Sequence, residues 1–143
     1  CQMHRVQQDI KGEDAATVMM KTADHATVVC DMSYASRTSR ERFPETFIVV
    51  EGDRGSVELG PDYRILITDE TGTVSRRYPP PHYSWADPAY DLVHSSIVPC
   101  NANILAGLQG RTGAQTTGQD NYQTVRLVFA SYGSARTGKV TML

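Results

Sequence analysis

Segments with the pattern of β-strands fill the first half of the chain, and helical segments fill the second half. Residues 1–78 contain about seven short stretches of strand-like residues, separated by turn residues and without any helical pattern between them. This order predicts a large antiparallel sheet, because tight turns join antiparallel neighbours whereas parallel strands need long crossovers. A proline-rich loop is expected at residues 79–87, helices at 88–137 and a closing strand at 139–143. The sequence therefore predicts an α+β fold, a large, open, mainly antiparallel sheet with helices packed on one face.

The clearest strand spans residues 26–34, where apolar and polar side chains alternate. Its apolar positions are Ala26, Val28, Cys30, Met32 and Tyr34. We expect this face to join the core, and the mixed opposite face to meet solvent, a partner subunit or a ligand. Two hairpin turns are expected further along the chain, at residues 52–55 and 69–72, and glycine is expected to supply the positive φ of the second turn.

The last helix carries signals at both of its ends. Thr117 and Asp120 have the spacing of a capping box, and Gly138 stands where a left-handed C-cap would end the helix, just after Arg136. Apolar residues between these ends recur at intervals of three and four and predict one buried face. They are Tyr122, Val125, Val128, Phe129, Tyr132 and Ala135.

The preceding helix is expected to start at Asp87-Pro88, because an N-cap followed by proline at the first helical position is a strong start signal. Pro99 should kink or split this helix near Val98. Gly110 should end it.

Composition limits the functional classes. A chain of 143 residues fits one domain, here residues 1–143, and the formal net charge of −2 is spread along the sequence. A nucleic-acid-binding protein would concentrate basic residues on one face, so this class is disfavoured. The small cluster of Arg37, Arg40 and Arg42 is interrupted by glutamates and is typical of a solvated loop.

The cysteines and the hydropathy give expectations about the compartment. Cys1, Cys30 and Cys100 are odd in number and widely spaced, which argues against a disulfide framework and favours a reducing, cytoplasmic setting. Cys30 and Cys100 are expected as small core residues. No apolar run reaches the length of a membrane span, so no membrane partner is expected.

Motifs for catalysis or for nucleotide binding do not stand out. The four histidines, His4, His25, His82 and His94, lack the spacing of a metal site, although ligands can converge from distant segments. No nucleophile elbow and no glycine-rich strand–turn–helix fingerprint occurs. By itself, the chain is expected neither to bind NAD nor to transfer a hydride.

Residues 82–87 concentrate ring side chains in a loop. His82, Tyr83 and Trp85, the only tryptophan, follow the prolines. Such residues fasten a loop to a sheet in many proteins, but they equally suit a pocket or a subunit contact. On the next helix, His94 and the two serines after it could hydrogen-bond a polyhydroxylated ligand, or serve only in packing.

Three segments, in order along the chain, resemble the C-terminal part of the Gfo/Idh/MocA oxidoreductases. Residues 115–143 (QTTGQDNYQTVRLVFASYGSARTGKVTML) are similar to the last helix of that family, with Gln119 in place of its usual acidic residue. Residues 11–37 are similar to its strand pair, and FIVVEGDRGSVEL at 47–59 to its hairpin. The resemblance covers nearly the whole chain.

The resemblance implies a glyceraldehyde-3-phosphate-dehydrogenase-like C-terminal domain for substrate binding and dimerisation. In that family an N-terminal Rossmann domain binds NAD or NADP and carries the E-K-P lysine. Those motifs are absent here, so we expect an inactive fragment without catalytic residues of its own. The implied partners are the missing Rossmann domain, a small-molecule substrate and a second copy of the chain. The second copy is expected to bind through the sheet face that includes Val29, Val49 or Val57.

The expected function is the substrate domain of a dehydrogenase acting on a sugar, polyol or related hydroxy compound. The candidates for substrate binding are Arg37, Arg40, His82, Tyr83, Trp85 and His94. Two alternatives stay open at this stage: a non-catalytic ligand-binding or protein-interaction module with the same fold, and a metal-dependent enzyme built on converging histidines.

Overall fold

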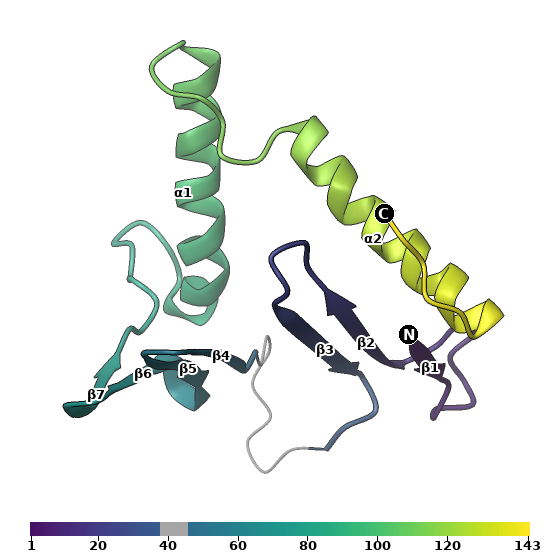
Figure 1. Cartoon of the computed structure of the whole chain (residues 1–143). Helices are drawn as coiled ribbons and strands as arrows, with labels where there is room; N and C mark the ends of the chain where they lie inside the picture. The colour runs from purple at the N-terminus through teal and green to yellow at the C-terminus, as the bar shows by residue number, and fades with distance from the viewer. Residues whose placement is uncertain (38–45) are drawn as a thin grey trace. The chain divides into compact units, whose positions relative to one another are not determined.

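The computed structural model describes residues 1–37 and 46–143, and these form two compact units (Figure 1). The first unit combines Cys1–Ser39 with Gln115–Leu143, and the second unit is Arg40–Ala114. The sequence suggested one domain over residues 1–143, with substrate-binding and dimerisation roles. Those roles stay a prediction, and each unit is described by itself below.

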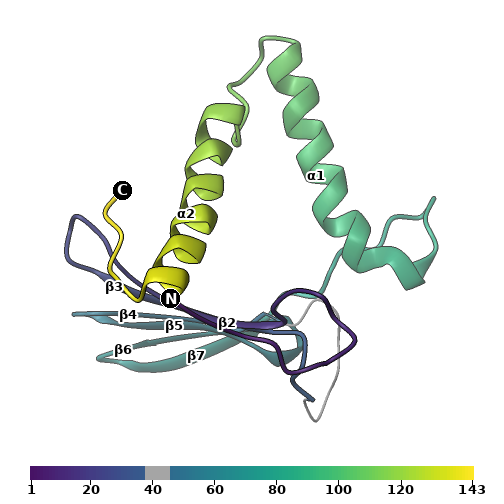
Figure 2. The same ribbon diagram turned by 90° about the vertical axis from the view of Figure 1, so that its right-hand side faces the viewer.

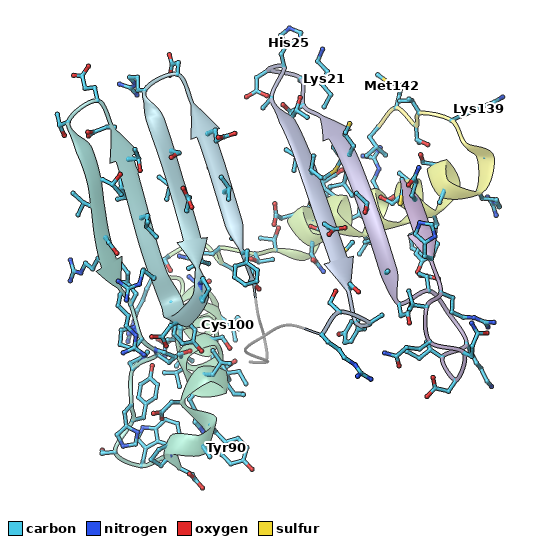
Figure 3. All side chains as sticks on the ribbon, turned by 90° about the horizontal axis from the view of Figure 1, so that it is seen from below. Lys21, His25, Tyr90, Cys100, Lys139 and Met142 are labelled. Carbon is cyan, nitrogen blue, oxygen red and sulfur yellow. The ribbon has the colours of Figure 1, made fainter. Side chains whose placement is uncertain are left out.

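The first unit is a three-stranded antiparallel sheet with one helix. Its strands are β1 (Gln2–His4), β2 (Ala15–Lys21) and β3 (Thr27–Ser33), in the order β1-β2-β3, and its helix is α2 (Gly118–Thr137). The helix lies against one face of the sheet (Figure 3). The β2–β3 turn closes through a hydrogen bond from the Thr22 N–H to the Ala26 carbonyl, with His25 at a φ of 70°.

The second unit holds a four-stranded antiparallel meander and the helix α1. The elements are β4 (Ile48–Gly52), β5 (Gly55–Gly60), η1 (Pro61–Tyr63), β6 (Arg64–Asp69), β7 (Gly72–Arg77), η2 (Pro88–Tyr90) and α1 (Asp91–Leu108). Each strand pairs with the next one along the chain, in the order β4-β5-β6-β7 (Figure 2). The α+β class and the antiparallel pairing are therefore confirmed, with two described sheets of three and four strands.

A glycine with positive φ lies in both the 52–55 and the 69–72 turn, as expected for the second. Gly55 has a φ of 149°, and a Cβ at this position would lie 2.1 Å from the carbonyl oxygen of Thr68 on the neighbouring strand. Gly72 has a φ of 134° and opens β7. Only a residue without a Cβ fits at position 55, so the turn and the strand register depend on it.

The ends of both helices follow from local signals. The Thr117 side chain accepts a hydrogen bond from the Asp120 N–H, and Gly138 caps α2 in the left-handed region with a φ of 68°. Asp87-Pro88 starts a 3-10 turn, and α1 follows it directly at Asp91. α1 runs through Pro99 as one element, so the expected split is wrong, while a kink near Val98, the other form of this expectation, stays a prediction.

Two expectations about the end of the chain are wrong. Residues 139–143 form no strand after Gly138, because they have no ladder partner among the described residues. The apolar face expected on α2 is exposed, for example Phe129 at 71%. Periodicity shows that a helix has an apolar side but not what covers it, and here Val128 and Tyr132 border a cavity of about 300 Å³ instead of a packed core.

The core expected along β3 is likewise not formed within the described residues. No apolar side chain among them is buried; Met32 and Tyr34 are exposed, and only Cys30 is half-buried. The three cysteines are free, and Cys100 is exposed rather than a core residue.

The meander has one apolar and one polar face. Val57 pairs with Val50, and the same row continues through Ile67 and Val74 on β6 and β7. Cross-strand partners point to the same side of a sheet. Val49 pairs with Glu58 instead, so the sequence-based grouping of Val49 with Val57 on one face is wrong.

Candidate functional site

Ring side chains gather where α1 begins. The Tyr83 and Trp85 rings lie with centroids 5.4 Å apart, and the Trp85 and His94 rings meet edge to face at 5.1 Å. Tyr90 adds a further edge contact to His94 at 6.4 Å. All three separations lie in the range where aromatic pairs attract. We call these four residues the aromatic cluster; Figure 3 labels Tyr90 at this end of α1.

A histidine–aspartate pair belongs to the same segment. The Nδ1 atom of His82 lies 3.0 Å from the Oδ1 atom of Asp91, and the two side chains are 50% and 23% exposed. A carboxylate at Nδ1 orients the imidazole and leaves the other ring nitrogen available to a ligand. The pair is thus a hydrogen-bonding group of fixed direction at the edge of the segment.

Local backbone geometry brings these side chains together. Three prolines separate the segment from β7. The Ala86 N–H then donates to the Tyr83 carbonyl at 2.9 Å, which closes a turn. The Asp87 carboxylate accepts from the Ala89 N–H, and the resulting 3-10 turn leads into α1. Tyr90 and His94 are four residues apart, the spacing at which helical side chains are neighbours.

The structure unites four of the six predicted site residues. His82, Tyr83, Trp85 and His94 all lie in the segment at the start of α1. Arg37 is exposed in the first unit, and Arg40 lies outside the described residues. Their part in a common site therefore stays a prediction.

Sequence reasoning missed two members of this group, Tyr90 and Asp91. The spacing of four between Tyr90 and His94 was a usable signal for the first. For Asp91 the only signal was its place as an acidic residue in the first helical turn. Acidic residues are common there because they interact favourably with the helix dipole, so the signal does not indicate a site. Its contact with His82 depends on how the loop folds back.

A second polar group in the first unit has a structural role. Asp14, the one buried polar residue among those described, accepts hydrogen bonds from the Val6 and Gln7 N–H groups at 2.7 and 2.8 Å. These two bonds lower the pKa of its carboxyl group. The carboxylate thus anchors the loop between β1 and β2.

Glu13 connects the same loop to α2. The Tyr132 hydroxyl donates a hydrogen bond to its carboxylate, which lowers the pKa of Glu13 and raises that of Tyr132. Both residues line the cavity between the sheet and the helix, together with apolar side chains such as Met3 and Val18. The bond stabilises this junction.

Residues 1–37 and 46–143 contain neither a cluster of metal-ligating side chains nor a membrane-spanning helix. Within them, no three His, Cys, Asp or Glu side chains come close enough to hold a metal ion. No helix of this part of the chain has the length and apolar character needed to cross a membrane.

Comparison with known proteins shows that the chain is similar to part of several oxidoreductases. No protein-family model matches it. Two curated relatives do, the D-apiose dehydrogenases of Paraburkholderia graminis (39% identical over 97% of this chain) and Rhizobium rhizogenes (34% over 94%). The chain spans 37% and 39% of the length of these relatives.

Solved structures show a similarity of the same kind. An oxidoreductase from Agrobacterium radiobacter, solved with NAD+, L-tartaric acid and magnesium, matches 96% of this chain with a TM-score of 0.89 and 33% identity. The chain corresponds to 40% of that protein. A Thermotoga maritima protein shares the fold with a TM-score of 0.73 at 17% identity. The expected resemblance to part of an oxidoreductase is confirmed.

Proposed function

We propose that this chain is the C-terminal, substrate-binding part of an NAD-dependent dehydrogenase of the Gfo/Idh/MocA type. The dehydrogenase acts on a sugar, polyol or related hydroxy compound. Two curated relatives that match nearly the whole chain are D-apiose dehydrogenases, and this similarity carries the proposal. The Agrobacterium oxidoreductase, solved with NAD+, supports NAD as the cofactor.

The cofactor is held mainly by a part of the enzyme outside these residues. A dinucleotide site needs a glycine-rich turn between a strand and a helix. The glycine turns described here, at residues 52–55 and 69–72, join antiparallel strands instead. The 143 residues therefore contribute substrate contacts and rely on the rest of the enzyme for hydride transfer.

The aromatic cluster and the His82–Asp91 pair form the substrate-facing part of the chain. Trp85 is 67% exposed although it is the largest side chain of the segment, so its ring is accessible to a ligand. His82 and His94 supply hydrogen bonds to hydroxyl groups. Arg37 and Arg40 stay candidates on sequence grounds alone, because they belong to another part of the chain. Rings with a few directed polar groups are typical of small-molecule sites.

The chain also supplies a surface for self-association. Val50, Val57, Ile67 and Val74 form an exposed row across the meander, with exposures of 59%, 43%, 51% and 69%. Contiguous apolar rows of this kind mark interfaces more often than solvent-facing surfaces. A second copy of the chain is the proposed partner. Light scattering should show a dimer that Ile67→Lys dissociates, and a monomer at high concentration would contradict this part of the proposal.

Steady-state kinetics of the dehydrogenase that contains this chain test the proposed function. With D-apiose and NAD+, His82→Ala and His94→Ala should raise the KM for the sugar about tenfold each and leave the KM for NAD+ nearly unchanged. The 143-residue chain alone should not reduce NAD+. An enzyme that reduces no NAD+ with any sugar or polyol, or variants with an unchanged sugar KM, would refute the proposal.

A further inference from the structure

The segment around the aromatic cluster has an unusual charge composition. Between residues 79 and 110 there is no lysine and no arginine, and the only charged side chains are Asp87 and Asp91. Asp91 is bound to His82, and Asp87 caps the 3-10 turn. The segment that holds the exposed Trp85 ring therefore carries only negative formal charge when the histidines are neutral.

The basic residues just before this segment are engaged elsewhere. The Nε atom of Arg77 lies 2.9 Å from a carboxylate oxygen of Asp62. The guanidinium of Arg76 lies 4.9 Å from the centre of the Tyr78 ring. Both arginines have partners on or next to the meander, so neither guanidinium group is positioned to pair with an anionic ligand.

Building on the proposed function, we propose that Trp85 is a stacking platform for the ring form of a neutral sugar, and that the segment discriminates against anionic hydroxy acids. The face of an indole ring is negative and attracts the weakly positive C–H groups on one side of a sugar ring. The hydroxyl groups at the sugar's edge then meet His82, whose direction Asp91 fixes.

Charge decides between the two ligand classes that the relatives suggest. D-Apiose is neutral, whereas L-tartaric acid, present in the Agrobacterium structure, is a dianion at neutral pH. A dianion placed beside two carboxylates, with no cation in the segment to pair with it, is repelled. A neutral sugar loses nothing to this repulsion and gains the contact with the ring.

Tryptophan fluorescence of the dehydrogenase that contains this chain tests the inference, with the Trp85→Phe variant as the reference that isolates the emission of Trp85. D-Apiose should change the emission in a saturable way, and L-tartrate should need at least tenfold higher concentration for the same change. An equal or greater affinity for tartrate would overturn the charge discrimination.

Calorimetry of variants tests whether the sugar stacks on the Trp85 ring or only lies near it. Trp85→Phe should keep most of the affinity for D-apiose, and Trp85→Leu should lose about tenfold. Phe129→Leu, at an equally exposed aromatic position on α2, is the matched control and should change nothing. The double variant Asp87→Asn with Asp91→Asn should strengthen tartrate binding, whereas Asp53→Asn in the β4–β5 turn should not.

The outcomes distinguish this inference from the function on which it rests. If D-apiose binds by calorimetry without a change in Trp85 emission, and Trp85→Leu binds it equally well, the platform is refuted while the proposed function stands. If the complete dehydrogenase binds neither compound, the proposed function fails, and this inference fails with it.

Discussion

The two parts of the second unit are held in shape by different forces. In the meander β4–β7, the pairing of backbone groups sets the position of every residue, and the glycines at the turns make that register attainable. In the segment from His82 to His94, short turns bring the side chains together, and ring pairs with one imidazole–carboxylate bond hold them in contact.

This difference indicates where stability and binding reside. Backbone ladders are buried in the sheet plane and present only half of their side chains to either face. A loop held by exposed rings keeps its chemistry accessible, but these contacts contribute less to folding. Substitutions in the meander should therefore reduce stability, and substitutions in the segment should reduce ligand binding.

The largest expected effect is that of Gly55→Ala in the meander. The added Cβ would lie 2.1 Å from the Thr68 carbonyl oxygen at a φ that alanine rarely adopts. We expect the free energy of unfolding to fall by about 3 kcal/mol or more, measured by urea denaturation. Gly52→Ala is the matched control, since its nearest neighbour would be 3.9 Å away. Equal free energies of unfolding for the two variants would contradict the claim that backbone pairing holds the meander in shape.

The second effect belongs to the segment and should show in binding rather than in stability. Trp85→Leu should lower the affinity for D-apiose about tenfold, or 1.4 kcal/mol, while the free energy of unfolding changes by less than about 1 kcal/mol. Thermal denaturation and calorimetry on the same sample measure both quantities. A large loss of stability would show that Trp85 fastens the loop, the alternative that the sequence left open.

A smaller effect is expected at the cap that links the segment to α1. Asp87→Ala removes the acceptor for the Ala89 N–H and should lower stability by about 1 kcal/mol. Asp87→Asn keeps a capping oxygen and should cost much less. Circular dichroism during thermal unfolding provides the measurement. A stability loss as large as that of Gly55→Ala would mean that this junction, too, is set by the backbone.

The smallest effect concerns acid sensitivity of the meander. The Thr71 hydroxyl and then its N–H lower the pKa of Asp69, as they stabilise the charged carboxylate. Because the folded pKa lies below the unfolded value, this stabilisation is present above about pH 4 and is lost as the pH falls through the folded pKa.

Thr71→Val removes the hydroxyl and should reduce the loss of thermal stability on going from about pH 6 to pH 3. Thr71→Ser keeps a hydroxyl and should behave as the wild type does. Identical pH profiles for Thr71→Val and the wild type would assign the acid sensitivity to other carboxylates.

The sequence predicted well what depends on neighbouring residues. Thr117 and Gly138 limit α2 as expected, because capping needs only the residues of one turn. The β6–β7 hairpin followed from its turn glycine in the same way. These features are local, so the pattern of the chain contains them.

Features that need contacts over longer distances were harder to predict. The apolar side of α2 suggested a buried face, yet Phe129 is exposed, since periodicity shows that a helix has two sides but not what covers them. Pro99 lies within one continuous helix, because a lost backbone hydrogen bond does not by itself end a helix held at both flanks. The His82–Asp91 pair depends on a loop fold that no spacing rule describes.

A crystal structure of the dehydrogenase that contains this chain, with NAD+ and D-apiose bound, tests the central claim most directly. We predict that one face of the sugar ring lies on the Trp85 indole, with a hydroxyl group within hydrogen-bond distance of His82. A sugar bound without contact to any residue from His82 to His94 would contradict the account.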